Sequence, residues 1–150
     1  MVWSHTSYMR EATVNTRTFA LVLGLGFIVA AIAGFFPSPP PPDAPPLVME
    51  HGHGLALGIL PVNTLHNLVH LLFGILGLAA YGGMFAARGY ARLVAVAYLA
   101  LAGLGLLPAT NTTLGLIPIY GADVALHAVI GLAAAYFGFM APAAVPVVRR

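Results

Sequence analysis

Four ionisable residues stand inside otherwise apolar stretches of this sequence. His66 and His70 lie four residues apart, and so do Asp123 and His127. On a helix, residues at that spacing share one face, with Cβ atoms roughly 6 Å apart. Ionisable groups inside an apolar helix are costly and are often functional. Each pair is therefore a candidate for holding one ion.

The types of these residues suit a divalent metal. Three imidazoles and one carboxylate, from His66, His70, His127 and Asp123, form a four-ligand set for zinc or another borderline ion. The hypothesis requires two helices to bring their polar faces together. Asn63 and Asn67 are candidates for hydrogen bonds behind the ligands.

Two other interpretations of the same residues stay open. His70 and His127, taken singly, are candidate ligands for a haem or chlorophyll, with Gly74 and Gly131 making room for the macrocycle. Alternatively, the polar side chains join helices by hydrogen bonds, and the glycines allow close helix packing. This hydrogen-bonding interpretation needs no cofactor.

The composition is typical of a polytopic membrane protein. Of 150 residues, 60% are hydrophobic and only 7% are charged, whereas about a quarter of the residues of a soluble domain are charged. So few charges suit a surface that faces a lipid bilayer. The absence of cysteine excludes disulfides and thiolate sites. A net charge of +2 from scattered arginines makes nucleic acid an unfavourable partner.

Four apolar runs are long enough to cross a bilayer, which needs roughly 20 residues of helix. The chain therefore predicts an all-α bundle of four transmembrane helices in a single integral membrane domain. Prolines at the ends of the runs support these limits, because proline is tolerated at the start of a helix and stops one from continuing. The predicted spans are 18–36, 61–80, 90–107 and 119–140.

The basic residues predict the orientation of the chain. All six are arginines, and they fall on one side of the predicted bundle, while the loops 37–60 and 108–118 have none. Basic residues near span ends favour the cytoplasm, so both termini are expected there, in a bacterial cytoplasmic membrane. The arginines are Arg10, Arg17, Arg88, Arg92, Arg149 and Arg150.

The chain also contains an internal similarity. Residues 61–74, PVNTLHNLVHLLFG, align with residues 118–131, PIYGADVALHAVIG, so that His70 coincides with His127 and His66 with Asp123. We predict a duplicated two-helix hairpin. A repeated hairpin favours a retained first span over a cleaved signal peptide, which the triplet Ala31-Ile32-Ala33 otherwise allows.

The loop 37–60 is rich in proline and polar residues. Residues 37–46, PSPPPPDAPP, predict an extended polyproline segment that acts as a connector or, alternatively, as a docking strand. Glu50, His51 and His53 are a candidate ion site at the membrane surface, but the flanking glycines favour a flexible polar loop.

The run from Gly58 to Gly77, GILPVNTLHNLVHLLFGILG, contains the pattern P-x-N-x-x-H-N-x-x-H. It resembles the signature of a family of small bacterial four-helix membrane proteins known as a domain of unknown function. The resemblance covers about residues 17–140 and implies four spans and a bacterial membrane, without an activity. The other similar segments are Arg17-Thr18-Phe19-Ala20, Tyr90-Ala91-Arg92 and residues 121–131.

The sequence contains no clear catalytic set. It lacks a G-x-S-x-G elbow and a phosphate-binding glycine loop, so we expect no enzymatic activity. The leading hypothesis is a non-catalytic accessory subunit that packs against other membrane subunits, with the aromatic residues Trp3 and Tyr8 as candidate contacts. The alternative is a metal- or tetrapyrrole-binding membrane protein that uses the His and Asp pairs described above.

Overall fold

The computed structural model describes residues 5–142, with side chains from residue 16 onward. Each of its four helices contains a stretch long and apolar enough to cross a membrane, which confirms the predicted all-α, four-span architecture. The helices are α1 (His5–Gly34), α2 (Thr64–Gly82), α3 (Ala87–Gly105) and α4 (Ala122–Ala135), and α4 continues as one π-helical segment, η1 (Tyr136–Met140). The corresponding candidate spans are Thr16–Gly34, Thr64–Gly82, Ala87–Gly105 and Ala122–Met140.

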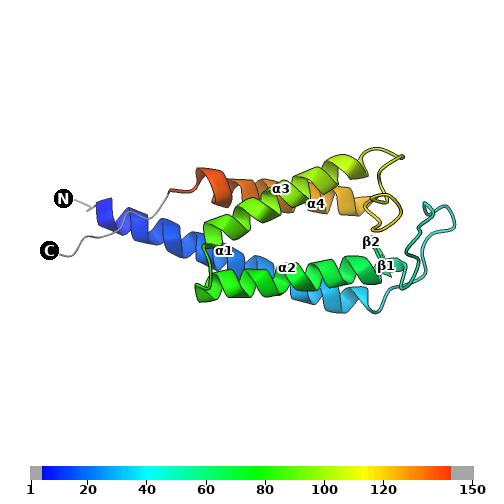
Figure 1. Cartoon of the computed structure of the whole chain (residues 1–150), viewed down its shortest axis with the longest axis horizontal. Helices are drawn as coiled ribbons and strands as arrows, with labels where there is room; N and C mark the ends of the chain where they lie inside the picture. The colour runs from blue at the N-terminus through cyan, green and yellow to red at the C-terminus, as the bar shows by residue number, and fades with distance from the viewer. Residues whose placement is uncertain (1–4, 143–150) are drawn as a thin grey trace.

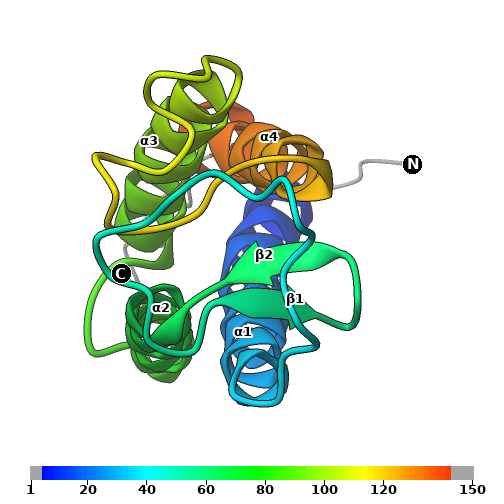
Figure 2. The ribbon, with the colours of Figure 1, turned by 90° about the vertical axis from the view of Figure 1, so that its right-hand side faces the viewer.

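The helices run side by side as two hairpins (Figure 1). α1 packs along α2, and α3 packs along α4. Viewed along the bundle, the four helices surround a common centre in the order α1, α2, α3, α4 (Figure 2). Contacts between the hairpins run mainly through α3, which meets both α1 and α2. The centre of the bundle is therefore lined by both hairpins.

Glycines bring α1 and α2 into backbone contact. A Cβ atom added to Gly77 would lie 2.7 Å from the Cα of Gly24, and one added to Gly74 would lie 3.0 Å from the Gly24 carbonyl oxygen. Gly131 of α4 faces Leu99 of α3 in the same way. These glycines therefore serve helix packing, and the space beside them is filled by neighbouring helices.

Two helices begin later than their prolines indicate. Pro61 lies in a short strand, and α2 begins at Thr64, where the Asn63 side chain caps the helix by accepting a hydrogen bond of 2.8 Å from the His66 backbone N–H. α4 begins after Gly121, which has a φ of +61°. Local caps therefore set these boundaries, and the prolines lie in the preceding connections.

The end of the bundle where α1 and α3 finish and α2 and α4 begin is called the outer end here. Its long loop is ordered by strands β1 (Gly54–Ala56) and β2 (Leu60–Val62), which pair antiparallel, and by a bridge from Ser38 to Leu55. The expected flexible loop thus contains a hairpin that lies across the bundle (Figure 2).

Asn63 joins the two outer loops. Its Nδ2 atom donates to the carbonyl oxygens of Met49, at 2.8 Å, and Leu116, at 2.7 Å. The Gly115 carbonyl accepts from the backbone N–H of Val48 as well. Because one buried side chain bonds to both loops and to the first turn of α2, these three segments are held together over the outer end.

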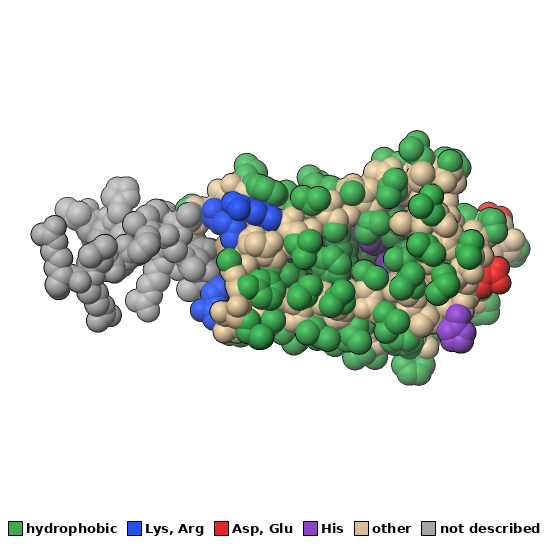
Figure 3. Space-filling view, in the orientation of Figure 1, with side chains coloured by type: hydrophobic (Ala, Val, Ile, Leu, Met, Phe, Trp, Pro, Cys, Tyr) green, Lys and Arg blue, Asp and Glu red, His purple; other side chains and the backbone are tan. Residues whose placement is uncertain are grey.

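Charge separates along the bundle (Figure 3). Among the described side chains visible in this view, arginines lie at the inner end, and acidic side chains lie at the outer end. The described arginines bond to carbonyl groups at the inner helix ends: Arg17 to Tyr81, Arg88 to Ala141, and Arg92 to Gly138 at 2.8 Å. The remaining arginines and the predicted aromatic contacts lie outside the described side chains: Arg10, Arg149, Arg150, Trp3 and Tyr8.

The distribution of polarity is inverted relative to a soluble protein. Large apolar side chains cover the sides of the bundle (Figure 3), as at Val22, Val29 and Val96, each 64–65% exposed. The buried side chains instead include His66, Asn67, His70, Asp123 and His127. An apolar exterior around a polar centre is the arrangement expected in lipid.

Candidate metal centre

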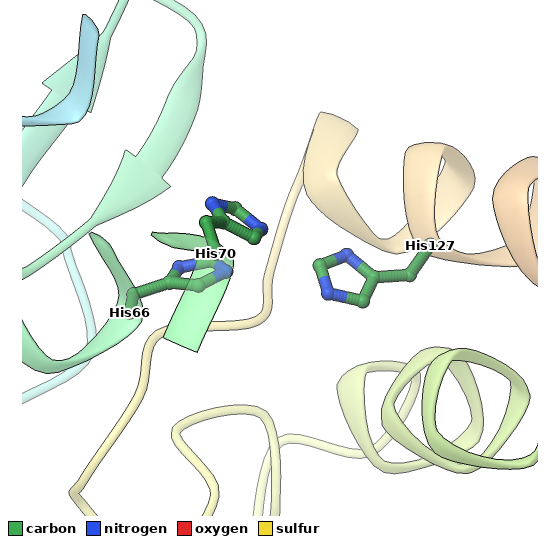
Figure 4. Close-up of side chains that lie close together, drawn as sticks. All are labelled: His66, His70 and His127. Atoms are coloured by element: carbon green, nitrogen blue, oxygen red, sulfur yellow. The ribbon is translucent and has the colours of Figure 1, made fainter. Parts of the chain in front are cut away.

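Three imidazole rings meet between α2 and α4 near the outer end (Figure 4). His66 and His70 come from the first turns of α2, and His127 comes from α4. Each ring offers one nitrogen, and these three nitrogens lie within 4.8 Å of one another. The three residues, called the His triad below, are 2%, 8% and 2% exposed. The two hairpins thus bring together three of the four predicted ligands.

The spacing of the His triad is close to that of a metal site. Zinc–nitrogen bonds of ~2.1 Å place the nitrogens of a tetrahedral site roughly 3.4 Å apart, so nitrogens that lie within 4.8 Å of one another would move closer on binding an ion. The Nδ1 atoms of His66 and His70 are buried and have no hydrogen-bond partner. The rings of these two residues lie 4.3 Å apart between centroids, so both are available to one ion.

Asp123 lies behind His127. The His127 Nδ1 atom is 2.9 Å from the Asp123 carbonyl oxygen and 3.2 Å from Oδ2 of its carboxylate. A carbonyl can only accept, so Nδ1 carries the proton and Nε2 has a free lone pair. A carboxylate behind a metal-binding histidine typically orients the ring. The structure therefore places Asp123 beside His127 and outside the cluster of three.

Aromatic residues from the other two helices enclose the His triad. Phe27 of α1 stacks on His70 with ring centroids 5.7 Å apart, and Tyr98 of α3 stacks on His127 at 4.5 Å. The Tyr98 hydroxyl is buried and has no hydrogen-bond partner. Sequence reasoning missed both residues. For Tyr98, the available sequence signal was a phenol hydroxyl in the middle of the apolar run 90–107.

The two asparagines do not bond to imidazole nitrogens. Asn63 holds backbone groups of the outer loops, as described above. The Asn67 amide is buried against Gly34 of α1, and neither its oxygen nor its nitrogen has a hydrogen-bond partner. Their predicted role behind the ligands is therefore replaced by loop attachment for Asn63 and helix packing for Asn67.

The polar residues of the outer loop form a separate contact. His53 Nε2 lies 3.1 Å from the Tyr120 hydroxyl. Burial lowers the pKa of His53, against the opposing effect of the Glu50 carboxylate. Burial also raises the pKa of Tyr120, and Asp43 adds to that rise. Among the described residues, only the His triad brings three or more potential metal ligands this close.

Chemically, the His triad is a set of nitrogen donors in a dry environment. Imidazole nitrogens are suited to zinc, copper, iron and nickel. Three such donors leave one position of a tetrahedral ion free, and the Asp123 carboxylate supplies a negative charge nearby. The arrangement can therefore bind a borderline divalent ion.

Comparison with known proteins places the chain in a family without assigning an activity. No curated protein and no solved structure matches it. A family model described as a domain of unknown function, DUF4383, matches residues 17–140. The matched region includes the His triad and Asp123. The chain therefore belongs to the DUF4383 family, in agreement with the resemblance of its span-two motif to a domain of unknown function.

Proposed function

We propose that this protein is an integral membrane metal-binding protein that holds one divalent ion of the zinc class. His66, His70 and His127 supply the ligands, and Asp123 orients His127. One observation carries the proposal: three buried imidazole nitrogens, from helices of different hairpins, lie within 4.8 Å of one another. Neutral histidines gathered in this way are typical of metal sites.

The unpartnered nitrogens favour a metal over purely structural hydrogen bonding. A buried polar atom without a partner costs roughly 1–3 kcal/mol. His66 and His70 both have such an Nδ1 atom, and hydrogen bonding between helices would be expected to satisfy it. An ion bound by the Nδ1 atoms of His66 and His70 would supply the interaction that these two atoms lack.

The packing favours an ion over a tetrapyrrole. A macrocycle ligated by His70 or His127 needs open space beside the ring. Phe27 and Tyr98 stack on these two rings, and Gly74 and Gly131 face neighbouring helices. The rings instead face one another across a short distance (Figure 4), which suits a single ion.

Metal content tests the proposal directly. The full chain is purified in mild detergent, loaded with Zn²⁺, dialysed extensively and examined by elemental analysis. We expect one equivalent of zinc in the wild type and a loss of that equivalent in His70→Ala. His51→Ala is the matched control, because His51 lies in the outer loop away from the His triad. Equal zinc content in all three proteins would contradict the proposal.

We also propose a bacterial cytoplasmic membrane location with both termini in the cytoplasm. The arginines at the inner end and the acidic residues at the outer end support this orientation. The chain has no cysteine, so single-cysteine variants are unambiguous. Leu57→Cys in the outer loop should react with an impermeant maleimide on intact spheroplasts, and Met84→Cys should react only in inverted vesicles. Both side chains are more than 70% exposed.

We propose that the two hairpins descend from a duplicated unit. The alignment of residues 61–74 with 118–131 is supported by a shared inner contact. Arg17 bonds to a carbonyl near the end of α2, and Arg88 bonds to one just after η1. In each hairpin, an arginine at the first helix thus holds the inner end of the second.

A second candidate function is that of a non-catalytic accessory subunit in a larger membrane complex. One observation favours it: α1 begins at His5, and its N-terminal part extends beyond the ends of the other helices (Figure 1). Native electrophoresis of gently solubilised membranes checks this role. We expect migration well above the monomer mass, and a monodisperse monomer would contradict the role.

A further inference from the structure

An ion bound to the His triad leaves a charge imbalance, and this step rests on the proposed function. Histidines bind metals in their neutral form, so a divalent ion keeps its full charge. Asp123 is the one acidic residue within the four candidate spans, and it contributes one negative charge. The centre then carries a net charge of +1. Net charge in a buried, apolar site is strongly unfavourable.

The coordination of the ion is incomplete as well. Zinc-class ions take four ligands, and the His triad supplies three. The Asp123 carboxylate faces Nδ1 of His127, so the imidazole ring separates it from an ion held at Nε2. No other His, Cys, Asp or Glu side chain of the described residues joins the group of three. The fourth position is therefore open to a ligand from outside the protein.

Tyr98 packs against the His triad and has an unused hydrogen-bond donor. Its ring stacks on His127 with an interplanar angle of 14°, and its hydroxyl is buried without a hydrogen-bond partner. It comes from α3, which supplies none of the three imidazoles. A phenol O–H is a hydrogen-bond donor, and donation to an anion is stronger than donation to a neutral acceptor.

We propose that the metal bound to the His triad takes a small monovalent anion, such as hydroxide or azide, as its fourth ligand, and that the Tyr98 hydroxyl donates a hydrogen bond to it. Such an anion completes the coordination and cancels the remaining positive charge. It also satisfies the unpartnered hydroxyl. One ligand class therefore accounts for three separate features of the site.

Azide binding to the Co²⁺ form tests this inference. Co²⁺ is loaded into the detergent-solubilised full chain, and azide is titrated while the visible absorption of the metal is followed. The wild type should show a saturable spectral change. Tyr98→Phe should still bind Co²⁺ but should bind azide roughly tenfold or more weakly, because it lacks the hydrogen bond to the anion.

Tyr90→Phe is the matched control. Tyr90 lies on the same helix and is equally buried, but its hydroxyl donates to the Phe73 carbonyl at 3.1 Å. This variant should bind azide as the wild type does. Equal azide affinity in Tyr98→Phe and the wild type, or no spectral response with Co²⁺ fully bound, would overturn the inference. Failure of Co²⁺ to bind would instead overturn the proposed function and the inference with it.

Discussion

Helices α2 and α4 each present two ionisable residues, four apart, at the outer end of the bundle, yet the two pairs differ in their surroundings. On α2, His66 and His70 both have an Nδ1 atom without a partner. On α4, Asp123 contacts Nδ1 of His127. In the proposed metal site, the same spacing would supply two ligands from α2, and one ligand with a neighbouring carboxylate from α4.

The difference has a simple electrostatic basis. Four imidazoles around a divalent ion would bring no negative charge into the centre of the bundle. The Asp123 carboxylate, at the position of α4 that aligns with His66, would supply one, with Oδ2 at 3.2 Å from Nδ1 of His127. The proton on that Nδ1 is directed by the backbone carbonyl of Asp123. In the proposed site, α2 would thus use this position for a ligand and α4 would use it for charge compensation.

The largest predicted effect comes from removing an α2 ligand. His66→Ala should weaken zinc binding by more than about 100-fold, beyond the usual effect of losing a residue behind a ligand. Competition with a chromophoric chelator measures the affinity. His53→Ala is the control, since His53 pairs with Tyr120 in the outer loop. Unchanged affinity in His66→Ala would mean that α2 contributes a single ligand.

The second prediction compares how α2 and α4 meet their neighbours. A Cβ atom on Gly77 would lie 2.7–2.8 Å from backbone atoms of α1, whereas one on Gly131 would meet the Leu99 side chain first, at 2.8 Å. Because backbone moves less readily than a side chain, Gly77→Ala should destabilise the protein by about 1–3 kcal/mol, and Gly131→Ala by less.

Unfolding in a detergent series measures that second difference. Gly26 has no neighbouring atom within 4 Å of an added Cβ, so Gly26→Ala should leave stability unchanged or increase it slightly. Equal losses for Gly77→Ala and Gly131→Ala would show that the two helix contacts are alike.

The third prediction concerns Asp123. If it supports His127 without binding the ion, Asp123→Asn should reduce zinc affinity about 10–100-fold, which is less than the loss in His66→Ala. The amide retains the shape of the carboxylate but has no charge. A loss as large as that of His66→Ala would restore Asp123 to the four-ligand set predicted from the sequence.

The smallest predicted effect concerns the outer loop. Burial lowers the pKa of His53, so the unfolded chain binds a proton more readily than the folded loop does. The His53–Tyr120 contact therefore contributes fully to stability above the ordinary histidine pKa of about 6.5. Its contribution decreases as the pH falls below that value. Hydrogen exchange of the β1 and β2 amides should accelerate at acidic pH, and His53→Asn should remove that dependence.

Much of the fold follows from the sequence because the bilayer imposes a length on each apolar run. The four spans, the placement of the described arginines at one end, and the shared helix faces of the His and Asp pairs were all predictable from the sequence. The residues at which α2 and α4 begin were less predictable. The Asn63 side-chain cap marks the start of α2, and the backbone turn at Gly121, with its positive φ, precedes α4.

The site was only partly predictable because helix rotation depends on packing between distant segments. Spacing identified His66, His70 and His127 but not the position of Asp123 behind His127. Tyr98 was missed because a single tyrosine in an apolar run has no periodic signal, and its role depends on the stacking of α3 against α4. Contacts of this kind can be identified only when the relative positions of all four helices are known.

The His triad draws its members from both hairpins, whereas most helix contacts lie within a hairpin. An ion bound to the His triad would therefore link the two hairpins, whose helix contacts are otherwise mostly internal to each hairpin. By thermodynamic linkage, whatever pulls the hairpins apart weakens the hold on the ion, and an ion at 100 times its Kd stabilises their docking by about 2.7 kcal/mol. Removal of the ion by a chelator should therefore loosen the contact between the two hairpins.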